Sequence, residues 1–408
     1  MINYSCISYK LVQNFEFKIF ILLLLIGCSA HESNYIPERL DKLHNLTAYP
    51  SDTEPEATIR FLQEESYGST DSTFVTVGGS VGSIMEVDKA GRVFIADRKL
   101  NSIHVFKADG QYLTKLGSKG KGPGEFLSIR SMKIQSNNLY VYDSLQLRFN
   151  VFSLDSLKYS HTINLHPQDW SHIEKLKTKV PTDYFVSSES SLVIKFTPHI
   201  QAIENMRDKN YTHSYYYINK QGEIISREIF KQRGTQVAFT NFQNRRFSVS
   251  LSFRGEPLMV LSSDGYIFSA WTEDFLVKVY DPNGEYIRAF YHSVEQIPLT
   301  RDDLIEKYDL GIDTPNLKYI KNADLPATWP VMQSMLIDGE NRLWVSKIVD
   351  NFEVYQWWVL DPSDGSLLAR FEWPREEPIE EVRNGYMYTR GTDEMDVRSI
   401  VKYKIKME

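Results

Sequence analysis

The residue types that could carry out chemistry are scattered in this chain of 408 residues. Its nine histidines stand singly, without the spacing that metal ligands show in a sequence. The chain contains no Gly-x-Ser-x-Gly elbow and no EF-hand-like calcium loop. Asp88 and Asp338 stand in turn sequences, where aspartate caps the turn more often than it binds a metal. We therefore predict no metal and no cofactor, and we consider catalysis the less favoured kind of function.

One glycine-rich stretch, residues 116–126, suggests a phosphate-binding loop. Backbone amides freed by glycine can face an anion, and Lys119 and Lys121 lie within the stretch. The Gly-Lys-Ser/Thr ending of a phosphate loop is missing, and no Gly-x-Gly-x-x-Gly stands between a strand and a helix. We favour a tight crossover between two strands, in which the glycines allow sharp bends.

The elements that must position these residues belong to a hairpin unit that recurs along most of the chain. Runs of aromatic and β-branched residues predict strands, and Asn, Asp and Gly between them predict turns. The second strands of the units begin at residues 93, 139, 192, 266, 343 and 386. A third and usually a fourth strand follow, and repeated four-stranded units are typical of β-propeller blades.

Six such units predict an all-β fold, a six-bladed β-propeller of four-stranded antiparallel blades. The last unit, near residues 379–405, has only three strands before the sequence ends. We expect an N-terminal strand to supply its fourth and close the ring, because closure removes exposed sheet edges. Residues 58–62 and 73–77 are both suitable, and we favour 73–77.

The glycine-rich stretch 116–126 resembles the inter-blade signature of NHL-repeat propellers. Over residues 80–405 the chain is similar to the NHL-like six-bladed β-propeller lipoproteins of bacteria, although its other inter-blade loops depart from the signature and the register near 230–260 stays open. Some NHL propellers are metal-dependent lyases and related propellers are lactonases, with ligands on the inner strands. The inner strands expected here contain no histidine. The resemblance therefore implies a fold more than an activity.

The first 27 residues are typical of a lipoprotein signal peptide. Lys10 and Lys18 precede an apolar core at 19–26 that is too short to span a bilayer as a helix. The core ends in Leu-Ile-Gly-Cys, which resembles the bacterial lipobox, so Cys28 would begin the mature chain and carry the lipid. An ordinary signal peptide with a chance cysteine is the alternative. Ser29, where inner-membrane lipoproteins have aspartate, implies by the same resemblance passage to the outer membrane.

The mature chain is expected to be a tether followed by one domain. Residues 28–57 are polar and contain three prolines, so we interpret them as lipid anchor and tether, and residues 58–408 as the propeller. The formal net charge of −7 gives no basic footprint for nucleic acid. Because Cys6 precedes the cleavage site, the mature chain has no pair of cysteines for a disulfide. We expect a monomeric propeller in the bacterial cell envelope, held to the membrane by its lipid.

The long insertions indicate which face of the propeller carries function. Loops between second and third strands and connections between blades lie on one face, and the remaining turns lie on the other. The long segments all belong to the first set, at 166–181, 197–212, 230–256 and 291–329. In the last of them, Thr300 and Asp303 predict a capped helix over the following residues, which either covers the channel mouth or, as we favour, packs on a blade.

Binding loops concentrate where loop length varies, so we expect a ligand on that loop-rich face. Candidate binding residues end the second strands there: Asp97, Arg98, Asp143, Trp271, Lys347 and Arg390. Such a mixture of charges and one tryptophan suits a polar ligand, although ordinary solvated loops have the same composition. The sequence favours a membrane-tethered protein that binds a protein or glycan partner. A channel-site hydrolase or lyase is the alternative, and it requires convergent polar groups with shifted pKa values in the channel.

Overall fold

The computed structural model describes residues 36–69, 75–77, 85–188, 191–206, 210–308, 313–392 and 397–408. The predicted signal peptide and Cys28 lie outside these residues. Residues 43–408 form one compact unit, and residues 1–42 separate as another, in which a short 3-10 helix, η1 (Glu38–Leu40), is described. Among the described helices none is long and apolar enough to cross a membrane.

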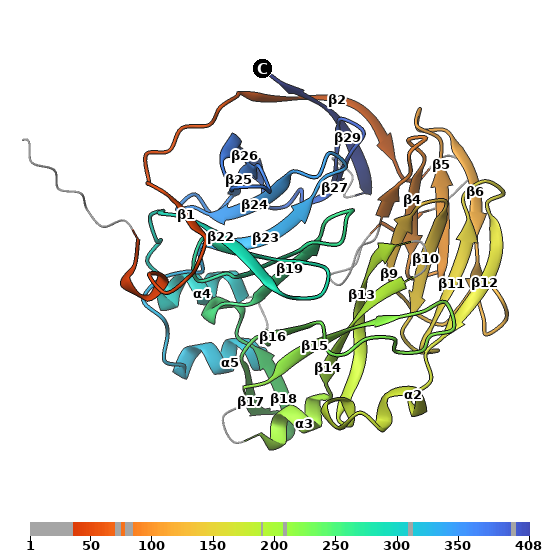
Figure 1. Ribbon diagram of the computed structural model, residues 1–408, viewed down its shortest axis with the longest axis horizontal. Helices are drawn as coiled ribbons and strands as arrows, with labels where there is room; N and C mark the ends of the chain where they lie inside the picture. The colour runs from red at the N-terminus through yellow and green to blue at the C-terminus, as the bar shows by residue number, and fades with distance from the viewer. Residues whose placement is uncertain are drawn as a thin grey trace, which may run out of the picture. The chain divides into compact units, whose positions relative to one another are not determined.

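The compact unit is a six-bladed β-propeller, as the sequence predicts (Figure 1). Blades 1 to 3 are antiparallel sheets of four consecutive strands. Blade 1 contains β3 (Met85–Val87), β4 (Val93–Asp97), β5 (Ser102–Phe106) and β6 (Tyr112–Leu116). Blade 2 contains β9 (Ile129–Gln135), β10 (Asn138–Asp143), β11 (Arg148–Ser153) and β12 (Lys158–Asn164). Blade 3 contains β13 (Lys179–Ser188), β14 (Ser191–Pro198), β15 (Thr212–Ile218) and β16 (Phe230–Arg233).

Blades 4 and 6 each gain one strand from the N-terminal segment, and blade 5 is hydrogen-bonded to it. Blade 4 contains β19 (Pro257–Leu261), β20 (Ile267–Trp271), β21 (Leu276–Tyr280) and β22 (Tyr286–His292), with β1 (Leu46–Tyr49) added in parallel at its outer edge. Blade 5 contains β23 (Met332–Ile337), β24 (Leu343–Ile348), β25 (Val354–Leu360) and β26 (Leu367–Pro374). Blade 6 contains β27 (Ile379–Arg383), β28 (Tyr386–Thr392), β29 (Arg398–Met407) and β2 (Ile59–Tyr67).

The ring is closed by β2, which pairs antiparallel with β29 from Ile59↔Met407 to Tyr67↔Ile400. Our preference for residues 73–77 is therefore wrong. Of these, residues 75–77 are described and form no strand; Val75 and Val77 are buried, and the Thr76 amide donates to Asp97. This segment makes the crossing from the outer strand of blade 6 to the inner strand of blade 1, a connection that every blade boundary needs.

The segment before β2 already belongs to the propeller. After β1 pairs with blade 4, the amides of Glu56 and Ala57 donate to the carbonyls of Leu367 and Leu368 in blade 5. Residues 46–67 thus run along the outer edges of blades 4, 5 and 6 (Figure 1). The tether that we predict as 28–57 consequently overlaps the folded unit at its C-terminal end.

Six hydrophobic clusters lie between neighbouring blades and stabilise the ring. The alternation of side chains along a strand explains how one blade serves two of them. Trp358 belongs to the cluster between blades 4 and 5, whereas its neighbour Trp357 belongs to the cluster between blades 5 and 6. Burying such large rings contributes strongly to stability.

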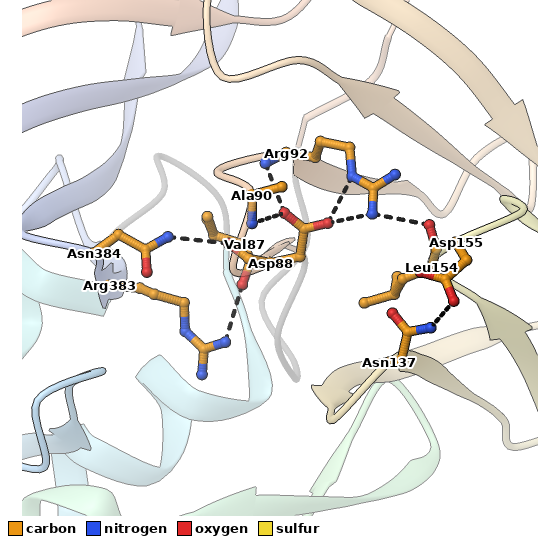
Figure 2. Close-up of polar contacts among 9 residues, drawn as sticks. All are labelled: Val87, Asp88, Ala90, Arg92, Asn137, Leu154, Asp155, Arg383 and Asn384. Atoms are coloured by element: carbon orange, nitrogen blue, oxygen red, sulfur yellow. Dashed lines mark hydrogen bonds and ion pairs between the residues drawn. The ribbon is translucent and has the colours of Figure 1, made fainter.

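The short turns of the opposite face, the turn face, are held by a polar network (Figure 2). Asp88 accepts from the amides of Ala90 and Arg92 and from the Arg92 guanidinium, which also donates to the Leu154 carbonyl of blade 2. Arg383 and Asn384 of blade 6 donate to carbonyls of the same turn. Asp338 and Arg342 repeat the arrangement in blade 5. These aspartates cap turns, as predicted.

The glycine-rich stretch is a tight crossover, built on β7 (Ser118–Lys119) and β8 (Glu125–Phe126). Gly117 has a φ of 69°, and a Cβ there would lie 2.4 Å from the Phe126 ring. The carboxylate of Glu125 accepts from the Gly122 amide at 2.8 Å and fills the space over Gly120. The position that a phosphate would need is thus occupied by the protein's own carboxylate.

The long insertions build a cap on the loop-rich face, over blades 3 to 5. It contains the hairpin β17 (Val237–Phe242) and β18 (Arg245–Ser250), then η3 (Ser252–Arg254), α4 (Arg301–Tyr308) and α5 (Pro315–Asn322). Shorter helices, α2 (Gln168–Ser171), η2 (Glu174–Leu176) and α3 (Ile200–Asn205), stand in the other insertions. Thr300 and Asp303 cap α4 as predicted. The cap has its own hydrophobic core, which includes Leu304 of α4, so this helix packs on the blade rather than standing free.

Candidate functional site

A cleft of about 370 Å³ lies between helix α4 and the edge of blade 5 on the loop-rich face. We call it the cap cleft. Helix α4 forms one wall of the cleft. Trp329, just before β23, and Phe352 and Tyr355, at the start of β25, form the aromatic wall. Arg375, which follows β26, completes the cleft. Its lining residues are Asp303, Glu306, Lys307, Trp329, Phe352, Tyr355 and Arg375. The volume is within the range of roughly 300–1,000 Å³ that small-ligand pockets occupy.

Aromatic rings and cations alternate in the cap cleft. The rings of Trp329 and Phe352 have centroids 5.5 Å apart. The Lys307 ammonium lies 5.1 Å from the Trp329 centroid, and the Arg375 guanidinium lies 4.4 Å from the Tyr355 centroid and 4.8 Å from that of Phe352. Such stacking holds cations over the electron-rich faces of the rings. The Arg375 Nε also donates to the Val354 carbonyl, which fixes the guanidinium in place.

Burial lowers the pKa of both cations, and the charge of Arg375 lowers that of Lys307 further. The side chain of Lys307 is exposed at the rim of the cleft. Burial of its charged end is the main cause that lowers its pKa, and the charge of Arg375 lowers it further. Burial also lowers the pKa of Arg375. Behind them, burial raises the pKa of Glu256, while the charges of Lys307 and Lys195 oppose that rise. The cap cleft is therefore lined by two cations, Lys307 and Arg375, and two carboxylates, Asp303 and Glu306, with Glu256 behind it.

A small cavity of about 20 Å³ continues the cap cleft toward the inner strands. Lys307 and Trp329 line both spaces, and Glu256, Thr272 and Gln333 line only the inner one. The Trp329 side chain is buried, and its Nε1–H has no hydrogen-bond partner within the described part of the chain. An unsatisfied buried donor of this kind is costly.

Charged groups of the cleft and of neighbouring blades affect one another's pKa. The charges of Lys307 and Lys195 lower the pKa of Glu256. The charge of Arg130 lowers the pKa of Lys195. The pKa of Arg98 is lowered by the charges of Arg130 and Arg390 and raised by that of Glu380. We call this series, with Arg375 and Asp183 included, the mouth ring. It contains the cations Arg98, Arg130, Lys195, Lys307, Arg375 and Arg390 and the carboxylates Asp183, Glu256 and Glu380.

Two of the predicted binding residues serve the fold. Asp97 and Asp143 end the second strands of blades 1 and 2, and both are 0% exposed. Asp97 accepts from the amides of Thr76 and Leu100, and Asp143 accepts from those of Leu127 and Leu145. Each carboxylate thereby ties an inter-blade connection to the next loop. Neither carboxylate is accessible to a ligand.

The other four predicted residues lie in three places. Arg98 and Arg390 come together in the mouth ring, where Arg98 donates to the Arg130 carbonyl at 2.7 Å and Arg390 pairs with Glu380. Trp271 lines a separate cavity of about 250 Å³ between blades 3 and 4, beneath the guanidinium of Arg233 at 4.3 Å. Lys347 is buried in blade 5, and this burial lowers its pKa.

A second charged cluster lies in the channel, on the inner strands of blades 6, 1 and 2. Lys133 donates to Glu86 at 2.8 Å, and Glu86 also accepts from the Ile134 amide. Burial, together with the charge of Glu86, raises the pKa of nearby Glu381 to about 7, although Lys133 opposes the rise. Burial disfavours the charged form of Lys133, but Glu86 and Glu381 outweigh it and hold its pKa above the ordinary value. In the described residues no three His, Cys, Asp or Glu side chains form a group that could hold a metal.

Sequence reasoning missed the residues of the cap cleft. The loop-rich face and the capped helix are readable from loop lengths and from Thr300 and Asp303. The convergence of Lys307, Trp329 and Arg375 is not, because they come from three segments that the cap core brings together. Signals within one segment could have grouped Asp303, Glu306 and Lys307 on the predicted helix, and Phe352 with Tyr355, but not the two groups with each other.

Comparisons with known proteins support the fold. A family model described as DUF5128, 6-bladed beta-propeller, matches residues 70–250. No curated protein matches the sequence. Among solved structures, a predicted exported protein from Bacteroides fragilis is similar with a TM-score of 0.51 and 13% identity, over 89% of this chain and 99% of that one.

Two further solved structures are similar at TM-scores below 0.5. A DUF4221 family member from Bacteroides vulgatus has a TM-score of 0.49 and 10% identity, over 86% of this chain and 99% of the other. Virginiamycin B lyase from Staphylococcus aureus has a TM-score of 0.40 and 12% identity, also over 86% and 99%. The likeness to the Bacteroides fragilis protein, at 13% identity, concerns the fold alone.

Proposed function

We propose that this protein is a lipid-anchored binding protein of the bacterial cell envelope, and that the cap cleft on its loop-rich face holds a protein or glycan ligand. The observation that carries the proposal is the asymmetry of the two faces. The turn face is closed by internal hydrogen bonds around Asp88 and Asp338, whereas the insertions of the other face enclose a cleft of about 370 Å³. Binding residues commonly lie on loops that a rigid scaffold positions.

The signal sequence supports a place outside the cytoplasm. The segment before Cys28 has the length and polarity of a lipoprotein signal, and the neighbour from Bacteroides fragilis is itself named as a predicted exported protein. The anchor would hold the N-terminal side of the chain near the membrane. The N-terminal segment then joins the propeller at the outer edge of blade 4.

The lipid anchor has a direct test. We expect mass spectrometry of the membrane-extracted protein to show a mature N-terminus at Cys28 that carries acyl chains, and Cys28→Ala to leave the precursor uncleaved or release the protein from the membrane. An N-terminal peptide that retains Gly27, or one that begins at unmodified Ser29, would disprove the anchor.

Ligand binding at the cap cleft is tested by a matched pair of variants. Phe352 in the cleft and Leu113 on the outer strand of blade 1 are both 38% exposed, so truncating either to alanine changes an accessible apolar side chain. We expect a ligand captured from the native envelope, once purified, to bind wild type and Leu113→Ala equally. Phe352→Ala should weaken it about tenfold or more, because stacked aromatic side chains are frequent binding hot spots. Equal binding by both variants would place the ligand elsewhere, and no captured ligand would contradict the proposal.

A channel-site hydrolase or lyase is the second candidate, because the pKa of about 7 at Glu381 suits a group that gives and takes a proton near neutral pH. Lys133 stays protonated beside Glu86, so it would hold charge rather than act as a base. The two candidates differ in their response to Glu381→Gln. That change should abolish turnover by a channel enzyme and leave binding at the cap cleft intact.

A further inference from the structure

We propose that the outer edge of blade 3 binds an extended segment of a partner protein, which adds a β-strand to β16 and places an acidic side chain in the cavity between blades 3 and 4. This site is separate from the cap cleft, so the inference goes beyond the proposed function and does not depend on it. Three features of the described residues support it: a sheet edge that no strand covers, a cavity beside that edge with more cations than carboxylates, and a strand addition that the protein itself makes on the neighbouring blade.

The outer edges of blades 3, 4 and 5 differ in what covers them. On blade 4, β1 pairs in parallel with β22, so this edge carries a fifth strand. On blade 5, the amides of Glu56 and Ala57 donate to carbonyls of β26. In blade 3, β16 is the last strand of its sheet among the described residues. An uncovered edge presents N–H and C=O groups that can pair with another strand, as β1 pairs with blade 4.

Two residues of β16 present their backbone groups at this free edge. In an antiparallel pair, alternate residues exchange hydrogen bonds with the partner strand, and the residues between them turn their N–H and C=O groups to the other side. The Gly234 amide, directly after β16, donates to the Tyr211 carbonyl, directly before β15. Because the same register continues through β16, Gln232 also bonds to β15, and Lys231 and Arg233 face the free edge. Both are exposed, so a short added strand can pair with them.

A cavity of about 250 Å³ lies beside this edge, between blades 3 and 4. All four residues of β16 line it, so the cavity follows the strand. Its opposite side includes Trp271 at the end of β20 and Leu276, Lys278 and Tyr280, which alternate along β21 and therefore share one face. The side chains of an added strand alternate in the same way, so a side chain that points toward blade 4 enters the cavity.

Three cations and one carboxylate are the charged residues that line the cavity. They are Lys231, Arg233, Lys278 and Asp274. The Arg233 guanidinium lies 4.3 Å from the centroid of the Trp271 ring, and this stacking leaves the N–H groups in the plane of the guanidinium able to donate. A carboxylate can accept two parallel hydrogen bonds from such a group, and Lys278, half-buried on β21, adds a second positive charge. The cavity therefore favours an acidic side chain and disfavours a basic one.

A second copy of this chain fits the edge less well than an acidic partner does. Two β16 edges paired with each other would bring Lys231 and Arg233 of both copies together, and like charges on adjacent strands are destabilising. An extended segment with a carboxylate meets the same residues with the opposite charge, which favours its association. The partner is therefore a protein segment that carries Asp or Glu between residues suited to a strand.

The probe for this site is a phage-displayed library of random heptapeptides, selected on the whole mature protein. Each enriched peptide is then synthesised, and its affinity is measured by fluorescence anisotropy. We expect the enriched peptides to share Asp or Glu at one position between β-branched residues. Changing that residue to Asn or Gln should weaken binding about tenfold, because a charge-assisted hydrogen bond is lost. Methylating one peptide amide at a time should abolish binding at every second position only, since alternate residues of an added strand bond to the edge.

Variants of the protein locate the binding and separate backbone pairing from charge. Lys231→Pro removes an N–H group of the free edge and leaves the hydrogen bonds between β15 and β16 in place, because proline is tolerated on edge strands. It should abolish binding of the acidic peptide and of its amide analogue, whereas Lys231→Ala should still bind the analogue. Lys278→Gln should weaken the acidic peptide about tenfold and leave the analogue unchanged. Lys404→Gln, an exposed lysine on β29, should match wild type. Thermal unfolding checks that each variant folds, and if Lys231→Pro does not, the methylation pattern tests the pairing by itself.

Four results would each overturn the inference: no enriched peptide, enriched peptides without a shared carboxylate, a methylation pattern without a period of two, or equal affinities of wild type and Lys278→Gln for the acidic peptide. A dimer that forms without peptide and is lost in Lys231→Pro would assign the edge to a second copy and overturn it as well. None of these results bears on the cap cleft, whose ligand is tested by Phe352→Ala. The proposed function can therefore stand when this inference fails.

Discussion

Replacing Lys133 by methionine is expected to lower the free energy of unfolding by about 2–3 kcal/mol at pH 7. The change leaves the carboxylate of Glu86, which is 3% exposed, without its counter-ion in the channel. An unpaired buried charge commonly costs about 3–5 kcal/mol, and we expect less because the Lys133 side chain is 38% exposed to channel water, which screens the pair. Urea unfolding monitored by tryptophan fluorescence measures the loss.

The pH dependence identifies the cause of that loss. In Lys133→Met, Glu381 faces the charge of Glu86 without the ammonium that opposes the rise in its pKa, so the pKa of Glu381 in the folded state rises further above its value in the unfolded chain. The folded variant then binds more protons than the unfolded one, and its stability rises as pH falls toward 5. The difference from wild type should therefore be largest at pH 8 and shrink at pH 5.

Two controls accompany this variant. Lys175 pairs with Glu228 at 2.7 Å but is 67% exposed, so Lys175→Met should leave the stability almost unchanged. In the double variant Glu86→Gln with Lys133→Met, the stranded charge is removed and most of the stability should return. Equal losses in Lys133→Met and Lys175→Met, or a loss that does not vary with pH, would show that Glu86 is not stranded.

The blades are readable from the sequence because each is a local pattern. Strand alternation and the turns at residues such as Asp88 and Gly284 lie within one repeat, so their signals do not depend on distant parts of the chain. The glycine-rich crossover is readable for the same reason: Gly117 and Gly124 must bend where Phe126 and Tyr159 approach them. The pairing of strands that are distant in the sequence is harder to predict, because several segments could pair with the same sheet edge.

The candidate site is less predictable than the fold for a physical reason. The second-strand ends are the natural place to look for polar ligands, and Arg98 and Arg390 do belong to the mouth ring. Asp97 and Asp143 occupy equivalent positions, but their carboxylates satisfy backbone amides that would otherwise be buried without partners. From sequence alone a loop-capping aspartate and a binding aspartate look the same.

Tyr67→Ala, in the strand that closes the ring, should lower the free energy of unfolding by about 3–5 kcal/mol, which is the range for removing a large buried ring. Tyr67 ends β2, is 0% exposed, and packs between blades 6 and 1 against Phe106 and Tyr388 at centroid distances of 6.0 and 6.4 Å. Its hydroxyl donates to the Ala108 carbonyl at 2.9 Å. Tyr67→Phe keeps the ring and should cost only about 1 kcal/mol.

The location of the weakening distinguishes ring closure from general loss of packing. The β2–β29 pairing joins segments about 333 positions apart, as the Ser66 to Ser399 hydrogen bond shows, so it pays the largest loop-closure entropy of the fold. Once it opens, two sheet edges and the cluster between blades 6 and 1 are exposed together. Hydrogen exchange in Tyr67→Ala should therefore accelerate first in β2 and β29, and least in blade 3. Leu62→Ala changes an exposed side chain of the same strand and should leave hydrogen exchange unaltered. Uniform acceleration of exchange in every blade would contradict the idea that the β2–β29 pairing opens first.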